Sequence, residues 1–483
     1  MKKEKSLSLN SFMNTFKTFM GLVFPLITYP YALRVLGVDN IGKNNYANSI
    51  VSYFILLAGL GISRYAIREG ARKRENRKEF SRFAGQMLAI NIVSVTVAYV
   101  ALFILLMLVP SLNSYAKLII LHSVTIFGTM IGMDWVNSAY EEYVYITLRT
   151  IAFQIISMLL LFVLVRDEND LMKYAFISVL SNIGANILNF FYIRKYTDIK
   201  ICFSGVKQHL APIMWLFASA IATTIYVNSD MTMLGAMCGD FYTGIYGVST
   251  KVYSIVKQML AAAIVVTLPR LSNLWANKRV DEYKKTINGV FNTFVTVLFP
   301  AMVGMILLSE EVVTIIGGIE YESATMSLKI LSVGLCFSIF GIFYTNTMLL
   351  PMKKERQITI IMIFSAALNV ILNLVLIPAF QQNGAALTTV IAELFVMGIQ
   401  IWMVRKEHLI TFNLRFIIGI LSGCLGIFCV VKTCQSLIAN VYLETAVSVT
   451  CSVLLYTILM VLFKNPFVLN ILRGLKKVMR RGA

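Results

Sequence analysis

Residues 64–82 read RYAIREGARKRENRKEFSR and carry eight of the 43 Lys and Arg residues of the chain. Apolar segments lie on both sides of this stretch, near residues 41–62 and 84–109. Each is long enough to cross a membrane, for which about 20 mostly apolar residues are needed. Because Lys and Arg are retained on the cytoplasmic side during insertion, the stretch predicts a cytoplasmic loop between two spanning helices.

The whole chain follows the same alternation of apolar segments and charged loops. Hydrophobic residues make up 58% of its 483 positions and charged residues 14%, whereas soluble domains contain about 25% charged residues. The pattern predicts fourteen spanning helices, at residues 11–33, 41–62, 84–109, 115–136, 147–165, 171–193, 210–235, 243–267, 287–309, 325–349, 357–377, 384–404, 414–432 and 442–463. We therefore expect an all-α polytopic membrane protein.

The basic residues are distributed unevenly between the loops. Besides residues 64–82, they concentrate in residues 194–207, 270–285 and 353–356 and in the tail 464–481. This sorting predicts a multi-pass protein with both termini in the cytoplasm. The net charge of +19 thus reports topology. Anionic lipid headgroups are the expected partners of these loops, and we expect no nucleic acid partner.

The sequence contains no recognisable catalytic or cofactor motif. It has no Walker A loop and no Gly-rich strand-to-helix turn. His122, His209 and His408 form no cluster, and the seven cysteines include no CxxC pair, so we expect no metal and no cofactor. The predicted outer loops are too short for the external active site of a membrane glycosyltransferase or polymerase. We therefore expect a protein that is not an enzyme.

A weak internal repeat divides the chain. Leu36-Gly37 after the first span resembles Leu234-Gly235 after the seventh, and the run from Gly42 resembles the run from Gly244. The offset is close to six spans, and an even number of spans leaves both repeats in the same orientation. We expect two six-helix lobes around a central cavity, followed by two extra helices. The predicted boundaries are 1–195 for the N-lobe, 196–209 for a cytoplasmic linker, 210–406 for the C-lobe, and 407–483 for spans 13 and 14 with a basic tail.

Polar residues within a span locate an aqueous path, because a helix that faces only lipid has no reason to carry them. In span 8 they follow one helical face or lie beside it, as Tyr246, Thr250, Lys251, Tyr253, Lys257 and Gln258. The helical rise places Lys257 near the middle of the membrane, where a lysine costs at least about 2.5 kcal/mol. Water, a partner or an anionic ligand must offset that cost.

Two carboxylates at depth are candidates for coupling to a proton or sodium gradient. Asp230 lies in span 7 with Tyr226 and Asn228, and Glu393 lies in span 12. Intramembrane charges usually pair, so Asp230 is equally compatible with a structural ion pair to Lys251. Glu393 has the same alternative of a structural pair with a cavity lysine.

Spans 1 and 2 add further polar groups. Asn14 and Lys17 lie in span 1, Arg34 stands at its outer end, and Asn45 and Asn48 lie in span 2. Lys17 is compatible with snorkelling to the cytoplasmic surface, and Arg34 with anchoring at lipid headgroups.

Several stretches resemble one family of membrane transporters. They are residues 24–31 (FPLITYPY), 34–37 (RVLG), 59–62 (GLGI) and 230–235 (DMTMLG). They are similar to the bacterial Wzx-type polysaccharide flippases of the MATE-like multidrug/oligosaccharidyl-lipid/polysaccharide exporter superfamily. This resemblance covers the whole chain. It implies two six-helix lobes, alternating access in the cytoplasmic membrane, and a substrate in which an oligosaccharide is joined through pyrophosphate to undecaprenol.

The resemblance and the buried cations together give the leading hypothesis, a flippase for such a lipid-linked oligosaccharide. Polysaccharide polymerase or assembly proteins would be its protein partners. The candidate anion-binding residues are Lys257, Lys251, Lys17 and Arg34. The candidate sugar contacts are Asn14, Asn45, Asn48, Tyr226, Asn228, Tyr246, Thr250, Tyr253 and Gln258. Asp230 and Glu393 are the candidate coupling residues.

Two alternative functions share the fold and differ in cargo, and a third is a protein without cargo. A MATE-like drug or cation antiporter would favour an acidic cavity without a midplane lysine, so the sign of the charge argues against it. A flippase for the lipid-linked peptidoglycan precursor would be essential for growth. A structural scaffold would tolerate cavity substitutions.

Overall fold

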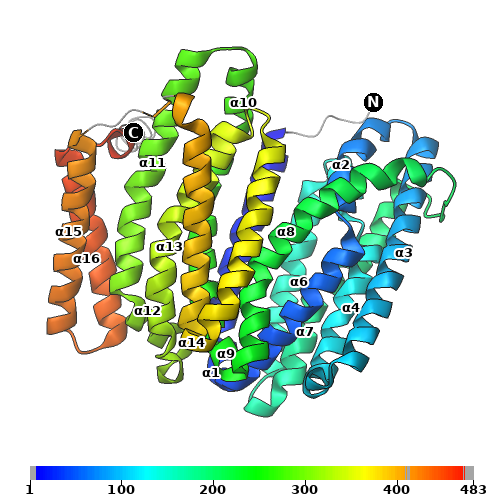
Figure 1. Ribbon diagram of the computed structural model, residues 1–483, viewed down its shortest axis with the longest axis horizontal. Helices are drawn as coiled ribbons and strands as arrows, with labels where there is room; N and C mark the ends of the chain where they lie inside the picture. Colours follow the sequence, from blue (N-terminus) through cyan, green and yellow to red (C-terminus); the bar gives the residue numbers. More distant parts are fainter. Residues whose placement is uncertain (1–6, 408, 411–413, 471–472, 474–483) are drawn as a thin grey trace, which may run out of the picture. The chain divides into compact units, whose positions relative to one another are not determined.

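The computed structural model describes residues 7–407, 409–410, 414–470 and 473. The described residues form helices and connecting turns and contain no strand, which confirms the predicted all-α class. His408 and most of the basic tail, on which part of the sequence prediction falls, lie outside the described residues. The chain divides after Gly244 into two compact units (Figure 1). The predicted lobe boundaries stay a prediction.

The first unit is built from eight α-helices and short 3-10 turns. The α-helices are α1 (Leu7–Gly59), α2 (Ile62–Lys73), α3 (Arg77–Leu108), α4 (Ala116–Gly132), α5 (Asp134–Ala139), α6 (Tyr143–Leu164), α7 (Leu171–Tyr192) and α8 (Lys207–Cys238). The turns are η1 (Pro110–Tyr115), η2 (Glu168–Asp170) and η3 (Ile193–Lys195). Apolar side chains of the second half of α1 pack with those of α3 and α4 around buried Val51, Ala98 and Ile119.

The second unit takes most of α9 and all later helices. The α-helices are α9 (Asp240–Val265), α10 (Leu268–Ala276), α11 (Val280–Leu307), α12 (Ser309–Gly317), α13 (Ala324–Tyr344), α14 (Glu355–Val404), α15 (Leu414–Leu437) and α16 (Val441–Leu462). The short elements are η4 (Ile319–Tyr321), the π-helical η5 (Thr345–Leu349) and η6 (Arg405–Glu407). Aromatic rings join α11 to α13, where the centroid of Phe294 lies 4.8 Å from that of Phe343.

Twelve helical stretches of the described residues are long and apolar enough to cross a membrane. The two longest contain α1, of 53 residues, and α14, of 50 residues, although about 20 residues suffice for one crossing. The backbone leaves helical geometry at Gly37 (φ 73°, ψ 173°) and at Gln381 (φ 48°, ψ −126°). Each long helix therefore covers two of the predicted spans, with the break between them. The number fourteen and the two-lobe layout stay predictions.

The predicted repeat has a clear counterpart around two glycines of the first unit. A Cβ atom on Gly42 would lie 1.9 Å from the carbonyl oxygen of Asp240, and one on Gly244 would lie 2.2 Å from that of Val38. The chain bends beside these contacts at Gly37 and at Gly239 (φ 91°, ψ −172°). The residue numbers of the corresponding positions in the two segments differ by 202 in each case (239 against 37, 240 against 38, 244 against 42).

This reciprocal contact fixes the register of the repeat. The internal repeat predicted from the sequence matched Gly42 with Gly244 correctly. Its match of Gly37 with Gly235 is wrong by four residues, because Gly239 is the residue that shares the left-handed bend of Gly37. The identical Leu-Gly dipeptides caused the error, since a dipeptide match carries no information about backbone conformation.

The basic stretch 64–82 is not the loop that the sequence predicts. Residues up to Lys73 form α2, and α3 starts at Arg77, where the side chain of Asn76 accepts hydrogen bonds from the backbone of Lys78 and Glu79. One face of α2 is buried, including Tyr65 and Ala66, and the other is charged. The helix α2 is therefore amphipathic. Within the stretch 64–82, only the turn 74–76 is not helical.

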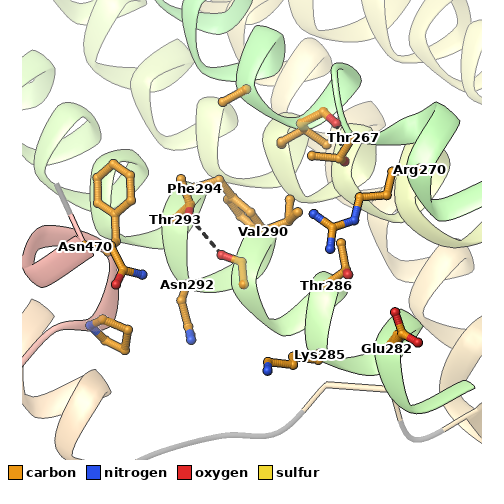
Figure 2. A pocket seen from close by; sticks show the side chains of 15 residues that line it. Thr267, Arg270, Glu282, Lys285, Thr286, Val290, Asn292, Thr293, Phe294 and Asn470 are labelled. Atoms are coloured by element: carbon orange, nitrogen blue, oxygen red, sulfur yellow. Dashed lines mark hydrogen bonds between the residues drawn. The ribbon is translucent and has the colours of Figure 1, made fainter. Parts of the chain in front are cut away.

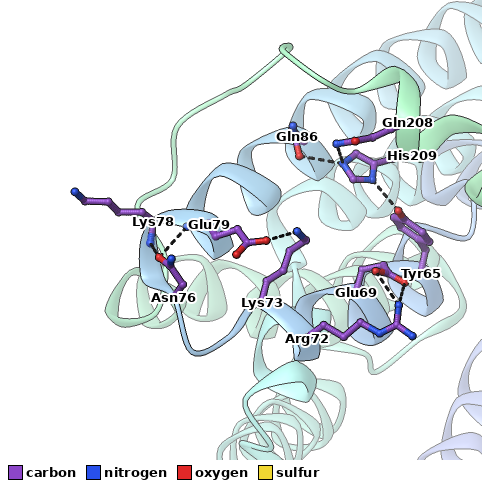
Figure 3. A network of polar contacts seen from close by, with 10 residues as sticks. All are labelled: Tyr65, Glu69, Arg72, Lys73, Asn76, Lys78, Glu79, Gln86, Gln208 and His209. Atoms are coloured by element: carbon purple, nitrogen blue, oxygen red, sulfur yellow. Dashed lines mark hydrogen bonds and ion pairs between the residues drawn. The ribbon is translucent and has the colours of Figure 1, made fainter.

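Buried polar contacts attach α2 to the start of α8 (Figure 3). The hydroxyl of Tyr65 lies 2.7 Å from Nδ1 of His209, and Oε1 of Gln86 lies 3.0 Å from Nε2 of the same ring. His209 is 5% exposed. Through these two contacts His209 on α8 is joined to Tyr65 on α2 and to Gln86 on α3.

Candidate functional site

The second unit contains an ion pair between two spanning helices. The ammonium of Lys257 on α9 donates a 2.8 Å hydrogen bond to Oε1 of Glu393 on the second arm of α14. The hydroxyl of Ser338 on α13 donates to the same oxygen over 2.9 Å. The exposed fraction of the side chain is 25% for Lys257 and 8% for Glu393. The carboxylate thus supplies the partner that a lysine inside a span needs.

Tyrosines of α9 pack beside this pair. The ammonium of Lys257 lies 5.5 Å from the ring centroid of Tyr253, within the range of a cation–π contact. About two turns before Tyr253 on α9, the hydroxyl of the buried Tyr246 lies 3.4 Å from that of Thr389. Both rings are more than nine-tenths buried, so they present little surface in this conformation.

The other predicted residues of α9 are more open. Lys251 and Thr250 are half-buried and Gln258 is exposed. The hydroxyl of Thr250 bonds to the backbone carbonyls of Tyr246 and Gly247 in its own helix. Six residues separate Lys251 from Lys257, which is about 9 Å along the axis and a rotation of about 240°. The two ammonium groups therefore leave the helix on different faces.

In the first unit, a hydroxyl cluster joins α8 to the second arm of α1. The hydroxyl of Thr232 donates to that of Ser49 over 2.9 Å and lies 3.2 Å from that of Tyr53. Asn228, one turn before Thr232, uses its amide in a 3.0 Å bond to the carbonyl of Thr224. Sequence reasoning did not single out Tyr53 or Thr232 as site residues, although they stand at helical spacing from Ser49 and Asn228.

The remaining predicted residues of the first unit are spread along two helices. Asn14, Arg34 and Asn48 are exposed, Lys17, Asn45 and Tyr226 are half-buried, and Asp230 is 6% exposed. Lys17 and Arg34 are 17 residues apart on α1, or about 26 Å. A single small anion cannot contact both of them at once.

A second intramembrane ion pair was missed by the sequence reasoning. Arg149 on α6 donates from Nη2 to Oδ1 of Asp134 on α5 over 2.6 Å, and its guanidinium lies 5.4 Å from the ring centroid of Tyr145. The side chain is 3% exposed for Arg149 and 50% exposed for Asp134. Arg149 lies two residues inside predicted span 5, and the sequence reasoning did not single it out.

The described residues contain no group of three His, Cys, Asp or Glu side chains that would hold a metal. What the helices do bring together is the Lys257–Glu393 pair, with the hydroxyl of Ser338 beside it, in the second unit, and the Arg149–Asp134 pair, whose aspartate is half exposed, in the first. The buried set of Lys257, Glu393 and Ser338 can exchange hydrogen bonds with a polar or ionic ligand. The fold and these groups define a multi-pass membrane protein of the transporter type.

Comparison with solved structures shows which known folds this chain is similar to. A lipid II flippase MurJ in an inward closed conformation is similar with a TM-score of 0.75 and 16% identity over 94% of this chain and 99% of that one. An inward-facing multidrug resistance MATE family transporter of the MOP superfamily is similar with a TM-score of 0.61 and 13% identity, covering 80% and 93%. At these identities the likeness shows the fold.

Sequence comparison gives the family. Residues 8–275 match the model of the polysaccharide biosynthesis protein family, and the chain belongs to that family. A putative O-antigen transporter of Escherichia coli K12 is 23% identical over 396 residues, 80% of this chain and 94% of the relative. The capsular polysaccharide biosynthesis protein CapF of Staphylococcus aureus is 23% identical over 74% of this chain and 88% of the relative. The resemblance drawn from residues 24–62 and 230–235 is thereby confirmed.

Proposed function

We propose that this protein is a flippase that moves an undecaprenyl-pyrophosphate-linked oligosaccharide across the bacterial cytoplasmic membrane for cell-surface polysaccharide biosynthesis. The names of its relatives, an O-antigen transporter and a capsular polysaccharide biosynthesis protein, support this cargo. The structural observation that carries the proposal is the pairing of Lys257 with Glu393 within the spanning helices. An exchangeable cation within the spanning helices would suit a pyrophosphate, which has to be desolvated to cross the membrane.

The chemistry of the exchange follows from the ion pair. A lysine ammonium has three donors, and in this structure Glu393 takes one of them. A pyrophosphate carries more negative charge than one carboxylate, so it competes with Glu393 for Lys257 at short range. When Lys257 turns to the cargo, Glu393 keeps its bond to Ser338 and gains affinity for a proton or a sodium ion. This step would couple transport to an ion gradient.

The other candidate residues act along the same path in this proposal. Lys251, Lys17 and Arg34 attract the anionic headgroup before and after it meets Lys257. Asn, Tyr and Thr side chains of α1, α8 and α9 bond to the sugars, and Asp230 is a second candidate for ion coupling. The basic ends of the helices face the cytoplasm, where the cargo is collected. Delivery on the other side would hand the oligosaccharide to polymerase or assembly proteins.

The decisive experiment separates a cargo contact from a structural ion pair. Lys257→Met leaves Glu393 charged and unpaired, so loss of transport by this variant alone is ambiguous. The double variant Lys257→Met/Glu393→Gln removes both charges and leaves no buried ion without a partner. We expect it to be present at near wild-type amounts but to translocate lipid-linked oligosaccharide at least 100-fold more slowly in reconstituted vesicles.

The matched control is the other intramembrane pair, as Arg149→Met/Asp134→Asn. It removes one positive and one negative charge from the first unit and should retain transport within about threefold. Transport by the Lys257→Met/Glu393→Gln variant at the wild-type rate would overturn the role of Lys257. Repeating the assay with proton or sodium gradients, alone and together, identifies the coupling ion.

Two alternative cargoes are measured in the same vesicles. Similarity to the MATE transporter favours a cationic drug, and similarity to MurJ favours lipid II. An acidic site suits the first, but Lys257 already uses the carboxylate of Glu393. We expect neither a cationic dye nor lipid II to be moved as fast as the lipid-linked oligosaccharide.

A further inference from the structure

A cavity of about 770 Å³ lies entirely within the second unit and has no part in the proposed transport path. Its walls come from the end of α9, from α10, from the first half of α11 and from residues 466–470 after α16. The volume lies within the range of about 300–1,000 Å³ that small-molecule sites occupy.

One end of this cavity is cationic (Figure 2). The guanidinium of Arg270 and the ammonium of Lys285 point into it, and Asn470 stands across the space from Arg270. The carboxylate of Glu282 also lines the cavity, but Arg279 neutralises it with a 2.7 Å hydrogen bond from Nε. Within the part of the chain that the structure describes, neither Arg270 nor Lys285 has an ion-pair partner. Two positive charges are therefore available to a ligand.

The other end of the cavity has uncharged walls, where Asn292 and Thr293 lie among apolar side chains. Along α11 the lining passes from Glu282 to Phe294, a distance of about 18 Å at 1.5 Å per residue. Val290 and Phe294 on α11 and Phe467 of the segment after α16 line this cavity. One site thus offers charge at one end and apolar surface at the other.

The length of α11 shows where this gradient lies in a membrane. Its 28 residues extend about 42 Å, whereas the hydrocarbon core is about 30 Å thick. The charged residues of its first turns require the excess to lie at that end, so the apolar core begins near residue 288. Arg270 and Lys285 then lie at headgroup level, and Val290 and Phe294 lie at the level of the acyl chains.

We infer that this cavity binds an anionic lipid of the leaflet on the basic side of the protein. The lipid phosphate lies between Arg270 and Lys285, and an acyl chain follows Val290, Phe294 and Phe467. Charge complementarity selects the anionic headgroup, and the apolar side chains at the other end select a molecule that carries a chain. This inference does not depend on the proposed flippase activity.

A glycine in the cavity wall allows a test that leaves the charge unchanged. No atom lies within 4 Å of the position that a Cβ atom on Gly289 would take. Gly289→Leu should therefore fill the path of the acyl chain and keep both cations. Arg270→Gln/Lys285→Gln removes the charge and keeps the space. The two variants weaken lipid binding by independent routes.

The experiment measures phosphatidylglycerol bound to the purified full chain in detergent, by native mass spectrometry during a lipid titration. We expect saturable binding of one molecule, with the dissociation constant raised at least tenfold by either variant. The control Arg356→Gln/Lys406→Gln removes the same charge from exposed positions outside the cavity. It should bind as the wild type does. Melting temperatures of all variants verify folding, and Gly289→Leu carries the test if the double variant is unstable.

Several outcomes would overturn the inference. Equal weakening by the control would mean diffuse surface attraction, and equal binding of phosphatidylcholine would mean a site without charge selection. Competition by millimolar glycerol phosphate, which has no chain, would mean a phosphate site that is not built for lipid. Unchanged binding in Gly289→Leu would exclude the acyl-chain path.

Discussion

At the scale of single residues, the two ion pairs between helices are stabilised by partners that differ in burial. In both ion pairs the partners differ in exposure, and the pair on α5 and α6 is the extreme case, with Arg149 at 3% and Asp134 at 50%. A buried charge that loses its partner costs far more than an exposed one. The two halves of such a pair are therefore not equivalent.

We predict that Asp134→Ala destabilises the protein by about 3–5 kcal/mol, because it leaves the guanidinium of Arg149 buried and unpaired. Arg149→Met should cost much less, since the carboxylate of Asp134 is half exposed to solvent. Unfolding of purified protein in detergent measures both. The double variant should recover most of the loss, and a double variant as unstable as Asp134→Ala would contradict this account.

At the scale of elements, the reciprocal glycine contact sets how closely the bent helices of the first unit cross. Gly42 and Gly244 each approach a backbone carbonyl of the other segment, which cannot move aside as a flexible side chain can. Any side chain there must separate the helices. The bends at Gly37 and Gly239 bring the segments to this crossing, and their left-handed φ angles favour glycine.

We predict that Gly42→Ala and Gly244→Ala each lower the free energy of unfolding by about 1–3 kcal/mol, the range for overpacked sites. The matched control is Gly21→Ala on the same α1, where no atom lies within 4 Å of the added Cβ. It should be neutral or slightly stabilising because alanine favours helix. Equal melting temperatures for Gly42→Ala and Gly21→Ala would show that the crossing adapts freely.

At the scale of the whole molecule, the sorting of charge predicts which ends of the helices face the cytoplasm. Lys78 near the start of α3 and Glu320 in η4 are both exposed and lie at ends of opposite charge character. We predict that an impermeant maleimide added to intact cells labels Glu320→Cys and does not label Lys78→Cys, in a background without the seven native cysteines. Labelling of Lys78→Cys alone would reverse the proposed topology.

The spanning helices were predictable because apolar composition over about 20 residues is a local property. The family was also accessible from short stretches such as residues 24–31. Position along the chain gave the depth of Lys257 and showed that its charge needed a partner. These inferences use only neighbouring residues and the rise of a helix.

The tertiary structure decided everything that joins distant segments. It paired Lys257 with Glu393, 136 residues away, and Arg149 with Asp134. It also placed the two glycine contacts in register and made the first part of the basic stretch 64–82, up to Lys73, an amphipathic helix that contacts His209. A sequence specifies which helices form and how deep each side chain lies. Which side chains meet depends on the rotation and crossing of packed helices, and these are set by the summed packing of many residues.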